Sequence, residues 1–110
     1  MSYDEKLAER VRGALARHKA VGEIKMFGGL CFTLRGNMLA GVLKDELMVR
    51  LPKEEDAATS KEPHVRPMDF TGRRMKGFHF VRPAGLRTDA QLRRWIERCS
   101  AYVSTMPPKA

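Results

Sequence analysis

The metal-ligating and nucleophilic side chains are the first candidates for chemistry in this sequence. The thiols Cys31 and Cys99 and the imidazoles His18, His64 and His79 come from separate segments. No two of them have zinc-finger spacing or lie four residues apart on a helix, so no metal site is predicted. The sequence contains neither a GxSxG motif nor carboxylates paired in an apolar setting. We therefore expect a protein that is not an enzyme and that binds no metal or cofactor.

The glycine pair Gly28-Gly29, preceded by Met26 and Phe27, is the next candidate. It does not fit a phosphate loop, because a Walker loop ends in Gly-Lys-Ser/Thr and the dinucleotide fingerprint needs three spaced glycines. A glycine pair beside a strand is typical of a bend, a bulge or the close approach of another backbone. We interpret this pair as a structural hinge between a first helix and a sheet.

Cationic side chains form the largest chemical surplus. Lys and Arg number 21 against 13 Asp and Glu, which gives a formal net charge of +8. Such a surplus attracts polyanions, including nucleic acid, acidic proteins and anionic lipid head groups. A further basic group on the first helix comprises Lys6, Arg10 and Arg17. The candidate interaction surface comprises Arg73, Arg74 and Lys76 in a loop and Arg94 and Arg98 on one face of the last helix.

Two readings of the basic residues remain open. Contacts to phosphates would make the protein a nucleic-acid binder, whereas a solvated basic face would serve solubility. Aromatic side chains for stacking on bases are poorly supplied, because the core needs them. No recognition-helix motif is evident.

Length and composition predict one soluble domain. The chain has 110 residues, of which 43% are hydrophobic and 31% charged, as expected for a globular protein with a modest core. We expect the domain to span residues 1–106, followed by a short tail at 107–110. No apolar run reaches membrane-spanning length and no signal-peptide pattern is present, so we expect a cytoplasmic protein. In that compartment the two cysteines are expected to be buried thiols.

Hydrophobic periodicity predicts the elements that position these residues. Apolar residues at spacings of three and four indicate a first helix over residues 4–18. Alternation then indicates an antiparallel meander with tight turns and three strands, at residues 30–35, 38–43 and 47–51. A short polar helix is expected at 53–60. Residues 63–77 are expected to be mostly loop, with at most a short strand at 68–70.

The C-terminal part is predicted to complete the sheet and cover it. Phe78 to Val81 has the pattern of a strand, with both phenylalanines on one face. Thr88 or Asp89 is expected to cap the last helix, which extends to about Thr105. Its apolar stripe, which includes Trp95, is the broadest in the sequence, so this helix should pack on the sheet.

Short motifs along the chain carry a family resemblance. In order they are Lys25-Met26-Phe27-Gly28-Gly29-Leu30, Gly36-Asn37-Met38, Gly41-Val42, Leu47-Met48-Val49-Arg50, Arg66-Pro67-Met68-Asp69-Phe70-Thr71-Gly72, Met75-Lys76-Gly77 and a final helix with Trp95. This order resembles the N-terminal domain of the TfoX/Sxy family over nearly the whole chain. The signature residues, interpreted as structural, are Met26, Phe27, Gly28, Gly29, Met68, Phe70, Gly72, Met75, Lys76 and Gly77.

The resemblance implies a fold and a biological setting. The fold would be α+β, a two-layer α/β sandwich in the order α-β(3)-α-β(2)-α with an antiparallel sheet, like that of secretion chaperones. Such domains often pair, so a homodimer is expected. The family includes regulators of natural competence, which act in transcription alongside the cyclic-AMP receptor protein. Those regulators carry a second domain, so this chain would be a stand-alone N-terminal domain that acts through protein contacts. The resemblance supplies no catalytic residues.

Overall fold

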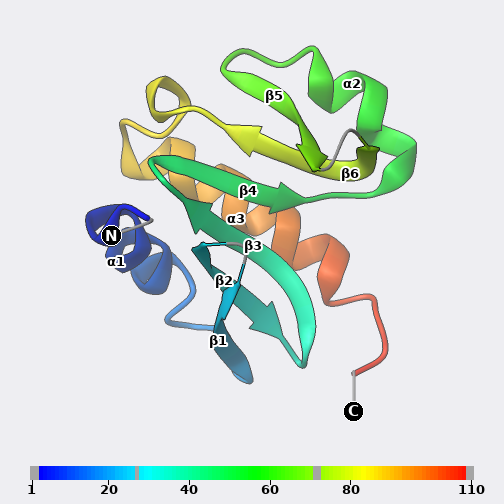
Figure 1. Cartoon of the computed structure of the whole chain (residues 1–110). Helices are drawn as coiled ribbons and strands as arrows, with labels where there is room; N and C mark the ends of the chain where they lie inside the picture. Colours follow the sequence, from blue (N-terminus) through cyan, green and yellow to red (C-terminus); the bar gives the residue numbers. More distant parts are fainter. Residues whose placement is uncertain (1–2, 27, 71–72, 109–110) are drawn as a thin grey trace.

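A helix lies near each end of the chain, and strands fill most of the sequence between them (Figure 1). The computed structural model describes residues 3–26, 28–70 and 73–108. The helices are α1 (Glu5–Ala14), α2 (Asp56–Ser60) and α3 (Asp89–Val103), with 3-10 turns η1 (Lys53–Glu55) and η2 (Pro83–Gly85). The strands are β1 (Val21–Met26), β2 (Gly29–Leu34), β3 (Asn37–Leu43), β4 (Glu46–Arg50), β5 (Val65–Phe70) and β6 (Arg73–Val81).

The strands of the described chain form a six-stranded antiparallel sheet in the order β1-β2-β3-β4-β6-β5. Tight turns link β2 to β3 and β3 to β4, where Leu34 lies opposite Asn37 and Leu43 opposite Glu46. The chain then leaves the sheet through η1 and α2 and returns as the β5–β6 hairpin, with β6 beside β4. β4 and β5 are therefore parallel to each other with β6 between them, and η1 and α2 form the crossover connection that joins them.

The main core lies between one face of the sheet and the helices. Alternate residues of each strand point into it, such as Leu30 and Phe32 of β2, where they meet Val11 of α1 and Ile96 of α3. All of these side chains are buried. The capping box at Thr88, whose hydroxyl accepts a hydrogen bond from the backbone N–H of Gln91, starts α3 where the sequence predicted. The predicted two-layer α+β architecture with an antiparallel sheet is therefore confirmed.

The sheet has one strand more than the sequence analysis predicted in its first half. Four strands, not three, precede α2 in the described residues, because 21–26 form β1. This strand lies at the sheet edge, where Glu23, Ile24 and Lys25 are all exposed. In its sequence the apolar residues Val21, Ile24 and Met26 do not alternate regularly with polar ones, so the pattern that predicted β2 to β4 is missing. The Gly28-Gly29 pair consequently belongs to the β1–β2 hairpin, and the predicted hinge between helix and sheet was wrong.

The second half of the sheet is also more extended than predicted. Residues 65–70 and 73–81 form β5 and β6, where mostly loop was expected. Pro67 was one reason to expect a loop there, but proline is compatible with an edge strand such as β5. The first helix ends at Ala14, earlier than the predicted His18, because Leu15 already departs from helical geometry with a φ of −97° and a ψ of 2°. No helix in the described chain is long and apolar enough to cross a membrane.

Two signature glycines occupy positions that exclude a side chain. A Cβ on Gly29 would overlap the carbonyl oxygen of Val42 and come within 2.8 Å of Leu43 Cγ. Gly77 has a φ of +88°, and a Cβ there would lie 2.7 Å from the carbonyl oxygen of Leu51. The Gly77 carbonyl also accepts a hydrogen bond from the Leu51 N–H at 2.8 Å. Both glycines therefore allow close backbone contacts, as interpreted from the sequence.

We predict that Gly77→Ala and Gly13→Ala change stability in opposite directions. The first places a Cβ against Leu51 at a positive φ and should lower the free energy of unfolding by about 2 kcal/mol. The second adds a Cβ within α1 that meets nothing within 4 Å, and should raise the free energy of unfolding by about 1 kcal/mol. Urea unfolding measures both values. Equal effects would contradict this account.

Candidate functional site

Arg94 and Arg98, the helical half of the predicted basic surface, both bind Glu62. Arg94 Nη2 lies 2.7 Å from Glu62 Oε1, and Arg98 Nη1 lies 2.9 Å from Glu62 Oε2. Both guanidinium groups also lie over the Trp95 ring, with Cζ 5.1 Å and 4.7 Å from its centroid. Arg98 Nη2 also lies 3.7 Å from Glu55 Oε1. Their charges are thus used within the protein to hold α3 against the segment that follows α2.

The pKa of Glu62 reflects this pairing. Burial would raise the pKa, but hydrogen bonds from Arg94 and Arg98 outweigh burial and hold the pKa below the usual range of a glutamate. The side chain of Arg98 is 25% exposed and that of Arg94 58% exposed. The Arg98 pair is therefore less screened by solvent and contributes more to stability.

The loop half of the predicted surface lies at the start of β6. Arg73 and Arg74 pair in register with Phe70 and Asp69 of β5, and their side chains lie outside the described part of the structure. Lys76 is exposed. Its neighbour Gly77 packs on Leu51 and Lys53, so this half borders η1, as Arg98 does through Glu55.

The family signature falls on the two hairpins at the opposite edges of the sheet. Its first half spans the β1–β2 hairpin, where Met26 lies opposite Gly29 and Gly28 has a φ of 74°. Its second half follows β5 and β6. Phe27 and Gly72 lie outside the described residues, as do the side chains of Met26, Met68, Phe70 and Met75.

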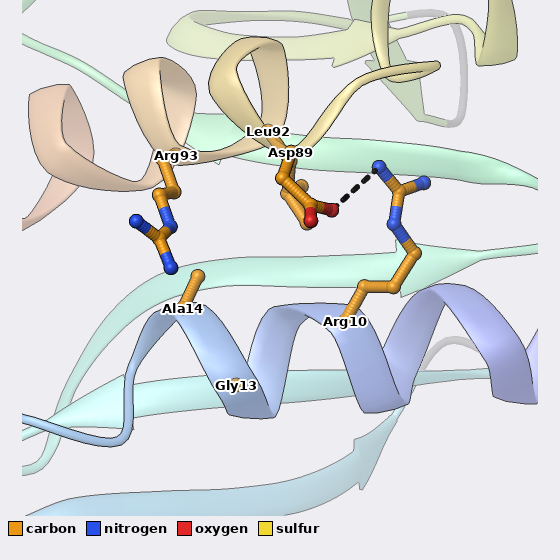
Figure 2. Close-up of a pocket in the computed structure, with 6 residues that line it drawn as sticks. All are labelled: Arg10, Gly13, Ala14, Asp89, Leu92 and Arg93. Atoms are coloured by element: carbon orange, nitrogen blue, oxygen red, sulfur yellow. Dashed lines mark ion pairs between the residues drawn. The ribbon is translucent and has the colours of Figure 1, made fainter.

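A hollow of about 270 Å³ separates α1 from the start of α3 (Figure 2). Arg10 extends from α1 toward Asp89, with Nη2 3.7 Å from Oδ1, and also donates a hydrogen bond to the Thr88 carbonyl at 3.3 Å. Arg93 extends from α3 toward the same gap and forms no ion pair with any described residue. Sequence reasoning grouped Arg10 with other cations of the first helix but had no signal that placed Arg93 beside it.

A second hydrophobic cluster lies on the other face of the sheet. It consists of strand residues, with Cys31, Met48 and Phe80 buried at its centre, and its partly exposed members are Met38, Leu43 and Phe78. Arg66 lies over the Phe80 ring, with Cζ 4.4 Å from the ring centroid. Arg66 also binds Glu46, with Nη2 2.6 Å from Oε1. Sequence reasoning did not identify this cluster, because alternation shows two faces but not which of them the helices cover.

Ser60, His79 and Asp56 are brought together where α2 packs on β6. The buried His79 Nε2 lies 3.0 Å from Ser60 Oγ and 3.4 Å from Asp56 Oδ1. Asp56 Oδ1 also accepts a hydrogen bond from the Gly77 N–H at 2.9 Å. A Ser-His-Asp triad needs the hydroxyl and the carboxylate on opposite ring nitrogens, whereas both approach Nε2 here. This cluster therefore ties α2 to β6.

The two thiols are buried, with 0% exposure, and neither is in a disulfide, as predicted. Burial raises the pKa of Cys99 to about 12 and also raises that of Cys31. Both remain protonated at neutral pH and are poor nucleophiles. Within the described chain, no group of three or more His, Cys, Asp or Glu could hold a metal ion.

Comparison with known proteins adds one match. The family model of the TfoX N-terminal domain matches residues 13–102 of the 110-residue chain. The match includes both glycine-containing hairpins and most of α3. No curated protein and no solved structure matched the chain.

We predict that Glu62→Gln destabilises the protein in a pH-dependent way. At pH 7 it should lower the free energy of unfolding by about 1 kcal/mol, because two charged hydrogen bonds weaken. The pKa of Glu62 is lowered in the folded state, so its contribution is full above the unfolded pKa of about 4.3 and is lost as pH falls through the lower folded value.

Urea unfolding at several pH values measures this difference. The unmodified chain and the variant should converge in acid, where the glutamate is protonated. Glu97→Gln is the control, since Glu97 is exposed on α3 and makes no ion pair within the described residues. A difference that stays constant from neutral to acidic pH would show that the charge of Glu62 is unimportant.

Proposed function

The chain belongs to the TfoX N-terminal domain family, and on this basis we propose that it is a non-enzymatic interaction domain. It pairs with a second copy and acts in the cytoplasm, through protein contacts, within an assembly that regulates transcription, as in competence regulation. Family membership supports the proposed role in transcription regulation. The structural support comes from the sheet face opposite the helices.

The second hydrophobic cluster is the observation that carries this proposal. A sheet with helices on one face usually presents polar side chains on the other. Here the central row of the second face contains Cys31, Met48 and Phe80, and Ile24 continues it on β1, opposite Cys31, with 51% of its surface exposed. Partly exposed apolar residues that continue into a buried cluster favour contact with another protein.

The polar clusters support a role without catalysis. Ser60 and Asp56 both approach the same nitrogen of a fully buried His79, so the serine lacks the arrangement of an activated nucleophile. Burial keeps Cys31 and Cys99 protonated. These groups stabilise the fold.

We predict that a photo-crosslinking residue at Phe78 captures a protein partner in cells of the source organism. Phe78 is partly exposed at the margin of the second cluster, so an occupant of this face would lie within reach. The control position is Arg17, which is exposed and lies between α1 and β1. Captured proteins are identified by mass spectrometry. Transcription components captured from Phe78 only would support the proposal, whereas equal capture from both positions would contradict it.

Direct nucleic-acid binding is the second candidate function. It is favoured by cations that make no ion pair within the described residues. One lines the α1–α3 hollow and two line a second hollow beside α1, and Arg10 lines both hollows. These cations are Lys6, Arg87 and Arg93. Arg94, by contrast, already binds Glu62. Phosphate contacts would therefore form at the α1–α3 hollow more readily than along the face that carries Arg94 and Arg98.

We predict for this second function that Arg93→Glu weakens oligonucleotide binding more than Arg94→Glu. The two residues are neighbours on α3 and the substitutions change the charge equally, but Arg94 is held by Glu62. Fluorescence anisotropy at several salt concentrations measures the affinity. The affinity should fall as salt is added, with a slope set by the number of phosphate contacts. Absence of binding at low salt would rule out this function.

A further inference from the structure

We propose that two copies of this chain join edge to edge through β1, in an antiparallel register centred on Ile24, to form one continuous sheet. This inference rests on the proposed pairing and specifies its surface and register.

The two edges of the sheet differ in their capacity to pair. β5 carries Pro67, which lacks an N–H, and its register with β6 shifts between Pro67 and Asp69. Both features blunt an edge strand. β1 pairs with β2 in an unbroken register from Val21 to Met26, contains no proline and is exposed at its centre. The β1 edge is therefore suited to accept another strand.

The ladder between β1 and β2 shows which backbone groups face outward. The Arg35 N–H donates to the Ala20 carbonyl at 3.0 Å, next to the start of β1. Hydrogen-bonded and non-hydrogen-bonded pairs alternate in an antiparallel ladder, so Gly22 and Ile24 bond to β2. The backbone N–H and C=O groups of Val21, Glu23 and Lys25 then point away from the sheet, where a second strand can bind them.

These directions restrict the registers that a two-fold axis allows. Outward-facing residues must lie opposite outward-facing residues. A register centred on Glu23 places two glutamates opposite each other, and one centred on Lys25 places two lysines opposite each other, which is unfavourable. Centring on Ile24 places Glu23 of each copy opposite Lys25 of the other. This register alone combines two opposite-charge pairs with an Ile24–Ile24 contact.

The side chains on each face fit this register. Ile24 lies on the same face as Cys31 and the second hydrophobic cluster, so its contact with the other copy extends that cluster across the interface. Glu23 lies on the helix face and binds Arg12, whose Nε is 2.8 Å from Oε2 and whose Nη2 is 2.9 Å from Oε1. Lys25 of the second copy would add a further cation beside the carboxylate of Glu23. The arrangement is isologous, as two-fold dimers require.

Disulfide trapping of Ile24→Cys tests the register directly. Two residues opposite each other in a non-hydrogen-bonded pair have Cα atoms about 4.5 Å apart, within the range of disulfides. We expect a disulfide-linked dimer on mild oxidation. Glu23→Cys alone should not cross-link with itself, but a mixture of Glu23→Cys and Lys25→Cys should form the mixed dimer. The variants are made in a Cys31→Ala background, because Cys31 lies opposite Ile24 on β2 and could form an intrachain disulfide with the new thiol. The Cys31→Ala chain is the control, since its remaining thiol, Cys99, is fully buried.

Charge reversal provides a second test that introduces no thiol. Lys25→Glu should weaken dimerisation about tenfold, because the symmetric dimer contains the Glu23–Lys25 pair twice. The double variant Glu23→Lys, Lys25→Glu should restore it. Lys61→Glu is the matched control, since Lys61 is exposed and follows α2, far along the sheet order from β1. Light scattering with size-exclusion chromatography over a concentration series measures the dissociation constant.

The outcomes separate this inference from the proposed function. A chain that stays monomeric at high concentration overturns both the pairing and this interface. A dimer that Ile24→Cys does not cross-link, and that Lys25→Glu does not weaken, overturns the β1 interface and leaves the pairing intact. Cross-linking at Ile24 with rescue by the double variant supports the inference.

Discussion

Packing of α1 and α3 on one face of the sheet is the constraint on which the remaining structure depends. The side chains of Val11, Trp95 and Ile96 meet the inward residues of β2, β3 and β4 in one continuous core. α2 joins the same layer through Asp56 and Ser60. Because the helices of the described chain lie on this face, they cover neither the opposite face nor the β1 edge. The proposed functions follow from that one-sided arrangement.

Internal pairing decides which charges of this basic protein can reach a partner. Arg94 and Arg98 meet Glu62, Arg12 meets Glu9 and Glu23, and Arg66 meets Glu46. The formal charge of +8 already subtracts the 13 acidic side chains, so these pairs affect where the unpaired cations lie and not the size of the surplus. Among the cations that form no ion pair within the described residues, Lys6, Arg87 and Arg93 line the hollows beside α1 and α3. The internal pairs weaken the case for the face that carries Arg94 and Arg98 as a nucleic-acid interface and leave the charge surplus itself unchanged.

The family signature is explained by backbone geometry. Gly29 passes too close to Val42 for any side chain, and Gly77 combines a positive φ with a contact to Leu51. These are constraints on the two edge hairpins of the sheet. Family membership therefore speaks to the fold more directly than to a partner.

The sequence by itself determined the helix stripe around Trp95, the start of that helix at Thr88 or Asp89, the alternation of β2 to β4 and the buried thiols. These features are local, because side-chain periodicity and capping depend on residues a few positions apart. The tertiary structure alone decided the β1 edge, the Glu62 bridge between distant segments and the placing of Arg93 beside Arg10. The apolar residues of β1 do not alternate regularly, and ion pairs between residues 32 or 36 positions apart leave no periodic signal. Such contacts exist only after the core has formed.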